Sequence, residues 1–163
     1  MIKKSVLNFI YSLILVTLTA LWCGYFNKVG MENFYSYINL PTLTPPDIVF
    51  PIVWTILYAL MIISFYIIIN IDDREKTKFT IQLFVTNCIL QIIWSFLFFY
   101  NAYFMVGFAV IVLLDFVVIM MIEYFYKLNK ISGILLIPYL LWLLFATYLN
   151  WAITDLNGAV YIF

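Results

Sequence analysis

The sequence contains no histidine and few charged residues. The absence of histidine among the 163 residues removes the commonest metal ligand, the usual axial ligand of haem and the usual general base. Charged residues make up only 10% of the chain, against about 25% in soluble globular proteins. The net charge is zero, so the charge balance does not point to nucleic acid as a partner. This composition argues against a soluble protein and predicts no metal site.

Long apolar runs take up most of the chain, and hydrophobic residues make up 67% of it. Five such runs, separated mostly by short polar turns, cover residues 6–26, 48–71, 79–100, 104–125 and 131–153. Each is close to the roughly 20 residues that a helix needs to cross a hydrocarbon core. Backbone inside lipid must satisfy its own hydrogen bonds, and the period-two alternation of a membrane β-barrel is absent. We therefore predict an all-α membrane protein, with residues 1–163 forming a single bundle of five transmembrane helices.

The basic residues are divided unequally between the two ends of such a bundle. Seven of the eight are expected at the end that holds the N-terminus and the turns after the second and fourth helices: Lys3, Lys4, Arg74, Lys76, Lys78, Lys127 and Lys130. Only Lys28 is expected at the opposite end. Because lysine and arginine collect on the cytoplasmic side, we predict a cell-membrane protein with its N-terminus in the cytoplasm and its C-terminus outside. We call these two ends the inner end and the outer end.

The connection between the first and second helices, residues 27–47, is the one long loop, and it belongs to the outer end. Pro41, Pro45 and Pro46 stiffen this loop, because proline fixes φ and restricts the residue before it. A loop of about 20 residues in an otherwise tight chain usually has a function. The outer half of the bundle is therefore where a functional site is expected.

The tryptophans lie mostly in that outer half. Trp22 and Trp151 are expected near the outer ends of their helices, where the simplest interpretation is an interfacial belt. Trp54 and Trp142 lie too deep for a belt, and Trp94 has a depth similar to that of Trp54. An indole N–H at such a depth needs a partner, either from the protein or from a ligand.

Polar side chains occur at similar depths. Asn87 and Gln91 are one turn apart on the third helix, and Asn150 lies two turns beyond Trp142 on the fifth. Such residues bond a neighbouring helix or line a cavity, and both alternatives stay open at this point. Asp115 is the only acidic residue near the membrane centre, so we expect it to be protonated, paired with a polar neighbour or in contact with water.

The two cysteines, Cys23 and Cys88, are expected at different depths of the bundle. A disulfide between them is therefore not predicted. Both are interpreted as small apolar packing residues.

Stretches around the second, third and fifth helices resemble the signature of a known family. Leu40–Pro46 and Val53–Tyr58 are similar to its LxKPxWxPP and WxxLY elements, and Trp94–Phe99 is similar to WSxxFF. Pro138–Asn150 keeps every fixed position of PYLxWxxFAxxLN. With the number of spans and the long outer loop, the likeness covers nearly the whole chain. The sequence resembles the translocator protein (TspO/MBR) family, also called tryptophan-rich sensory proteins or peripheral-type benzodiazepine receptors.

This resemblance implies a five-helix bundle, often a homodimer, with a ligand cavity beneath the outer loop. Family members bind tetrapyrroles such as protoporphyrin IX and haem, and benzodiazepine-type ligands. The positions that match the family's pocket are Tyr35, Phe50, Trp54, Gln91, Trp94, Trp142, Ala146 and Leu149. A flat aromatic molecule suits such positions, through ring stacking and a few hydrogen bonds in an apolar cavity. The implied partners are such a molecule and membrane lipid; porphyrin or haem would be a ligand, and no cofactor is required.

The chain also departs from the family pattern. Leu40 and Leu43 stand where lysine and tryptophan are usual, and Gln91 replaces a common asparagine. Asp115 comes about one turn later than the family's acidic residue in the fourth helix. No lysine or arginine follows Asn150, so the basic end of a cholesterol-recognition pattern is missing and sterol binding is not expected.

Three functions compete at this point. The first is a membrane receptor or carrier for tetrapyrroles, acting in tetrapyrrole homeostasis or stress response. The second is an enzyme for light- and oxygen-dependent porphyrin degradation, which the resemblance associates with the positions of Trp54 and Trp142. The third is a membrane scaffold or regulatory protein. No conventional acid–base constellation accompanies the two tryptophans, because an indole is neither an acid nor a base at neutral pH.

Overall fold

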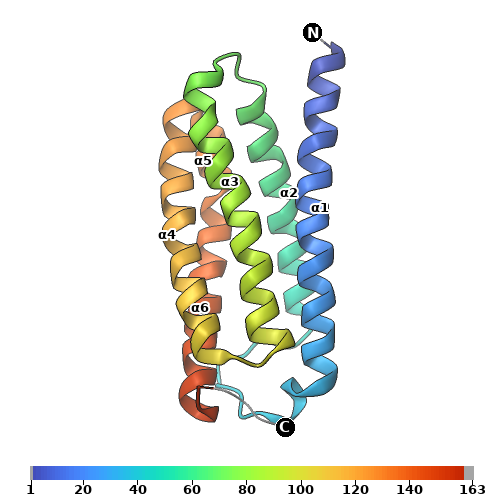
Figure 1. Cartoon of the computed structure of the whole chain (residues 1–163), viewed down its shortest axis with the longest axis vertical. Coiled ribbons are helices and arrows are strands. Elements are labelled where there is room, and N and C mark those ends of the chain that lie inside the picture. The colour runs from blue at the N-terminus through green and yellow to red at the C-terminus, as the bar shows by residue number, and fades with distance from the viewer. Residues whose placement is uncertain (1, 160–163) are drawn as a thin grey trace.

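The fold is a bundle of long helices that run back and forth along one axis (Figure 1). The computed structural model describes residues 2–159, with side chains from Lys4 onward. The helices are α1 (Ile2–Asn33), α2 (Val49–Ile69), α3 (Arg74–Ser95), α4 (Phe104–Leu128), α5 (Lys130–Leu135) and α6 (Ile137–Asn157), with a 3-10 turn η1 (Tyr35–Tyr37) and a π-helical turn η2 (Phe96–Tyr100). Within the described residues, five helical segments are long and apolar enough to cross a membrane. The predicted all-α, five-span architecture is confirmed.

The helices extend further than the apolar runs on which the prediction rested. α1 covers Ile2–Asn33, whereas the first run covers residues 6–26. α3 begins at Arg74, because the Asp73 side chain accepts a hydrogen bond from the backbone N–H of Lys76 at 3.1 Å and caps the helix. Apolarity reports the part of a helix that lies in hydrocarbon, so it misses helical turns that continue into the headgroup region.

The fifth span is broken into two helices, α5 and α6, where one continuous helix was expected. The break falls at Leu136, two residues before Pro138, which has no backbone N–H to donate a helical hydrogen bond.

α5 is held against α2 by two reciprocal hydrogen bonds between serines. Ser64 Oγ donates to Ser132 O, and Ser132 Oγ donates to Ser64 O, each at 2.8 Å.

The inner half of the bundle is closed by stacked aromatic rings. The rings of Phe65 and Phe84 stack at 4.0 Å between centroids, and Phe125 lies 6.2 Å from Phe84. All three side chains are fully buried. These three rings therefore fill the interior of the inner half between α2, α3 and α4.

The two ends of the bundle differ as the distribution of lysines predicted. The first residues of α1, the α2–α3 turn and the α4–α5 turn lie at one end, and the long loop and the end of α6 lie at the other (Figure 1). The loop is tied to α6 by Asn39 and Asn157: the Asn39 N–H donates to Asn157 Oδ1 at 2.8 Å, and Asn157 Nδ2 donates to Asn39 O at 2.9 Å. Which end faces the cytoplasm remains a prediction.

Candidate functional site

A cavity of about 540 Å³ lies in the outer half of the bundle, between α1, α2, α3 and α6 and beneath the long loop. The structure brings seven of the eight predicted pocket residues to its wall: Tyr35, Phe50, Trp54, Gln91, Trp94, Trp142 and Ala146. Leu149, the eighth, does not line the cavity. It lies one turn beyond Ala146 on α6 and is buried, with 5% of its surface exposed.

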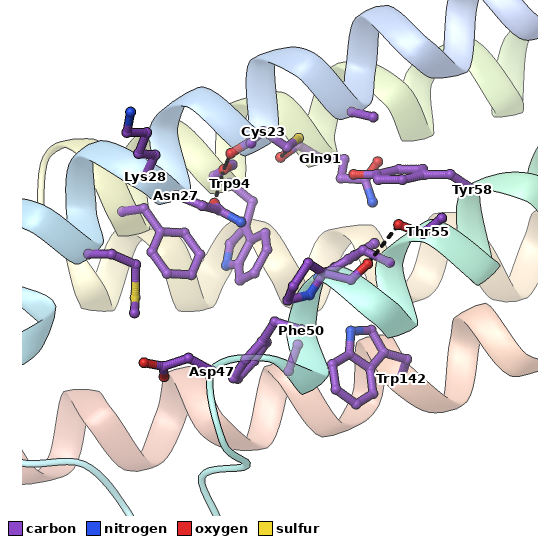
Figure 2. A pocket seen from close by; sticks show the side chains of 18 of the residues that line it. Cys23, Asn27, Lys28, Asp47, Phe50, Thr55, Tyr58, Gln91, Trp94 and Trp142 are labelled. Atoms are coloured by element: carbon purple, nitrogen blue, oxygen red, sulfur yellow. Dashed lines mark hydrogen bonds between the residues drawn. The ribbon is translucent and has the colours of Figure 1, made fainter.

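One side of the cavity is aromatic. In Figure 2, Phe50 and Trp142 lie together, and their rings meet edge to face at 5.9 Å. Trp54 stacks on Tyr58 at 5.3 Å and lies 6.2 Å from the ring of Tyr139. Within the described part of the chain, the indole N–H groups of Trp54 and Trp142 make no hydrogen bond. The two indoles thus present aromatic ring surface and free N–H donors to the cavity.

Trp94 differs from these two tryptophans. Its Nε1–H donates to Asn150 Oδ1 at 3.0 Å, and Asn150 Nδ2 donates to Phe104 O at 2.9 Å. Trp94 is 6% exposed, and its ring stacks on Phe98 at 5.9 Å. Of the two alternatives for Asn150, the structure shows a bond between helices. The Trp94 indole N–H is already engaged by the protein.

Gln91 is a buried amide whose side chain has no partner among the described residues. Its side chain lines the cavity (Figure 2), the residue is 1% exposed, and neither Oε1 nor Nε2 makes a hydrogen bond. Its neighbour Asn87 does bond another helix, since Tyr139 OH donates to Asn87 Oδ1 at 2.8 Å. A buried amide without partners costs about 1–3 kcal/mol, so a polar group inside the cavity would gain by bonding Gln91.

The α1 side of the cavity was missed by sequence reasoning. Cys23, Gly24, Asn27 and Lys28 all line it, and Figure 2 shows Cys23, Asn27 and Lys28 along one helix. Asn27 Oδ1 accepts a hydrogen bond from Ser95 Oγ at 2.7 Å. The only available signal was the spacing of these residues by three and four positions, which places them on one helical face.

Charged groups lie at the mouth of the cavity under the loop. Lys28 and Asp47 both line it, and Lys28 forms an ion pair with Glu32 at 3.8 Å. Tyr35 is buried beside them, and burial, assisted by the Asp47 carboxylate, raises the pKa of its phenol to about 12. The phenol therefore stays neutral at physiological pH. The mouth is polar, whereas the deeper wall is aromatic.

Two further polar expectations can be compared with the structure. Asp115 is paired with a polar neighbour, because Thr147 Oγ1 donates to Asp115 Oδ2 at 2.8 Å. Cys23 and Cys88 are both free and buried, as their different depths predicted. Among the residues that the structure describes, no group of three or more histidine, cysteine or acidic side chains could hold a metal ion.

Comparison with known proteins agrees with this architecture. The profile of the TspO/MBR family matches residues 4–156. The chain belongs to the TspO/MBR family. The "Tryptophan-rich protein TspO" of Archaeoglobus fulgidus is similar to this chain. The two are 36% identical over 158 residues, which cover 94% of this chain and 99% of the relative.

Other members of the TspO/MBR family are also similar to this chain. The "Tryptophan-rich protein TspO" of Chlorobaculum tepidum is 33% identical over 125 residues, which cover 76% of this chain and 79% of the relative. The "Tryptophan-rich sensory protein" of Cereibacter sphaeroides is 28% identical over 126 residues, covering 77% of this chain and 78% of the relative.

Proposed function

We propose that this TspO/MBR protein is a membrane receptor or carrier for tetrapyrroles, such as protoporphyrin IX and haem, and for benzodiazepine-type ligands. It would act in tetrapyrrole homeostasis or stress response. The observation that carries the proposal is the aromatic cavity of about 540 Å³ with the unpartnered Gln91 amide in its wall. Its volume lies in the range of small-molecule sites, about 300–1,000 Å³.

The polarity of the cavity fits a ligand with a flat apolar body and a polar edge. The tetrapyrrole ring would lie against Trp54 and Trp142, with Gln91 bonding a pyrrole nitrogen or its proton. The carboxylates of the ligand would lie at the mouth near Lys28, the cation that lines it. Neutralising those carboxylates as methyl esters should therefore remove any contribution of Lys28 to affinity.

Quenching of tryptophan fluorescence by added protoporphyrin IX tests the proposal. We expect saturable quenching, reversed by a benzodiazepine-type competitor, because both molecules would occupy one cavity. Lys28→Gln should weaken binding of the free acid but leave binding of the dimethyl ester unchanged. Quenching that rises without saturation, as for partition into detergent, would contradict a binding site.

Haem is expected to bind about as well as metal-free protoporphyrin, because no histidine is present and ring stacking would dominate. Titration of both ligands under the same conditions measures this. Haem binding more than about tenfold tighter (~1.4 kcal/mol) would require an axial ligand. Cys23, which lines the cavity, would then be the first candidate, and Cys23→Ser the variant to examine.

Light- and oxygen-dependent porphyrin degradation is the second candidate function. It is favoured by the position of Trp54 and Trp142 on one cavity wall with free N–H groups. Illumination of the protein–protoporphyrin complex, followed by absorption spectroscopy, separates the two functions. A receptor or carrier leaves the ligand spectrum intact. An enzyme loses the ligand, and it stops doing so in Trp54→Phe or Trp142→Phe even at saturating ligand.

A further inference from the structure

A second cavity lies at the inner end of the bundle, on the far side of the stacked phenylalanines. It has a volume of about 450 Å³ and lies between α1, the α2–α3 turn and α3. Its two helical walls are Lys4, Asn8 and Tyr11 on α1, and Arg74, Thr77 and Ile81 on α3. Spacings of three and four residues place each set on one face of its helix.

Both walls change in the same order from charged to apolar. The cations Lys4 and Arg74 come first, followed by Asn8 and Thr77, and Tyr11 and Ile81 are the deepest. Seven residues of helix span about 10 Å. A membrane changes from headgroups to hydrocarbon over about 5–8 Å on each side. The two helical walls therefore change from charged to apolar over a depth similar to that from the headgroup to the acyl chains of a lipid. Ile69, Ile71 and Asp72, beside the α2–α3 turn, complete the lining.

At the charged end of this cavity, one cation has no ion-pair partner among the described residues. Lys4 pairs with Asp72, and Lys76 pairs with Asp73 at 2.8 Å. Arg74 makes no ion pair or side-chain hydrogen bond with any described residue. A guanidinium offers a planar fork of donors that matches two phosphate oxygens.

We propose that this cavity binds a phospholipid with an anionic headgroup. Arg74 bonds the phosphate, Asn8 and Thr77 lie beside the glycerol esters, and an acyl chain packs on Tyr11 and Ile81. The inner end is the end that the lysine distribution predicts to be cytoplasmic, and the cytoplasmic leaflet carries the anionic lipids. This site is independent of the tetrapyrrole cavity.

Native mass spectrometry of the detergent-purified protein tests the site. Phosphatidylglycerol and phosphatidylcholine with the same acyl chains are added in equal amounts, and the retained lipid is counted. We expect the wild type to retain phosphatidylglycerol preferentially. Arg74→Gln should reduce that preference about fivefold (~1 kcal/mol). Lys78→Gln is the matched control, because it removes an equal charge on α3 from a residue outside the cavity lining.

A second variant, whose expected effect on lipid preference has the opposite sign, distinguishes lost lipid binding from misfolding of Arg74→Gln. Asp72→Asn removes the carboxylate that lines the cavity and frees Lys4, so it should raise the preference for phosphatidylglycerol. Three results would overturn the proposal: no preference in the wild type, an equal loss in Lys78→Gln, or no increase in Asp72→Asn. Retention of free glycerol phosphate as strong as that of the lipid would show a phosphate site instead.

Discussion

At the scale of single residues, the three deep tryptophans differ in what their indole N–H groups bond. Trp94 donates to Asn150, whereas Trp54 and Trp142 have no hydrogen-bond partner among the described residues. The depth expected from the sequence predicted that the indole N–H of each of the three needs a hydrogen-bond partner. The difference depends on which face of each helix meets a polar neighbour. Trp94 should therefore govern stability, and the other two should govern ligand binding.

Replacing Trp94 by Phe should destabilise the protein. The change leaves the buried Asn150 Oδ1 without its donor, which costs about 1–3 kcal/mol. Unfolding in mixed micelles, followed by circular dichroism, measures this cost. Trp22→Phe is the control, because Trp22 is 53% exposed and a surface change costs at most about 0.5 kcal/mol. Equal stability of the two variants would contradict the role assigned to the Trp94–Asn150 bond.

Replacing Gln91 by Met should separate stability from affinity. The apolar side chain removes two unpartnered buried polar atoms, so the ligand-free protein should be as stable as the wild type or more stable. Protoporphyrin affinity should fall by about 0.5–1.5 kcal/mol, the worth of one hydrogen bond. Thermal unfolding and fluorescence titration of the same samples give both quantities. Lower stability with unchanged affinity would mean that Gln91 serves the fold and not the ligand.

At the scale of helices, the sequence predicted the spans but not how they end or bend. The apolar runs gave five helices, because only helices satisfy backbone inside lipid. The break at Leu136 and the π-helical turn Phe96–Tyr100 were missed, since both lie inside continuous apolar runs. Pro138 was a visible signal for the break, whereas nothing in the sequence around Phe96–Tyr100 pointed to a π turn.

The contact between α1 and the π-helical turn depends on Gly30. A Cβ added there would lie 2.5 Å from the backbone oxygen of Phe99, so either α1 or the turn must move. Gly30→Ala should therefore lower the free energy of unfolding by about 1–3 kcal/mol. It should also weaken ligand binding, because Phe99 lines the cavity. Unfolding and titration measurements check both effects.

Gly24 on the same helix provides the control for Gly30. A Cβ added at Gly24 meets no atom within 4 Å, so Gly24→Ala gains helix propensity without a clash. Its free energy of unfolding should rise by about 0.5–1 kcal/mol. If the two alanine variants had the same stability, the close approach of α1 to Phe99 would be absent from the protein.

At the scale of the whole molecule, the orientation in the membrane can be tested from outside the cell. Asn33 is the last residue of α1 and Lys76 lies in the first turn of α3, so the two residues belong to opposite ends of the bundle, and both are exposed. On a background without Cys23 and Cys88, an impermeant thiol reagent should label a cysteine placed at Asn33 and spare one placed at Lys76. The reverse pattern would invert the predicted topology.

The site was predictable where a motif covered it and unpredictable elsewhere. The family motifs in the loop, α2, α3 and α6 indicated eight pocket positions. Seven of these eight residues line one cavity, where they form the walls contributed by α2, α3 and α6 and the cover contributed by the loop. The fourth wall, Cys23, Asn27 and Lys28 on α1, carries no motif and looks like any lipid-facing helix in the sequence. Only the packing of α1 against α3 shows which face of α1 turns inward.

The central claim is that Trp54 and Trp142 form the wall of a ligand cavity. Protoporphyrin titrations of the corresponding variants test it most directly. Trp→Phe at either position should cost about 0.5–1.5 kcal/mol of binding, and Trp→Ala about 2–4 kcal/mol. Trp151→Phe should change little, because Trp151 is 51% exposed and does not line the cavity. A loss of affinity in Trp151→Phe, with Trp142→Ala binding like the wild type, would place the ligand elsewhere in the bundle and contradict the account.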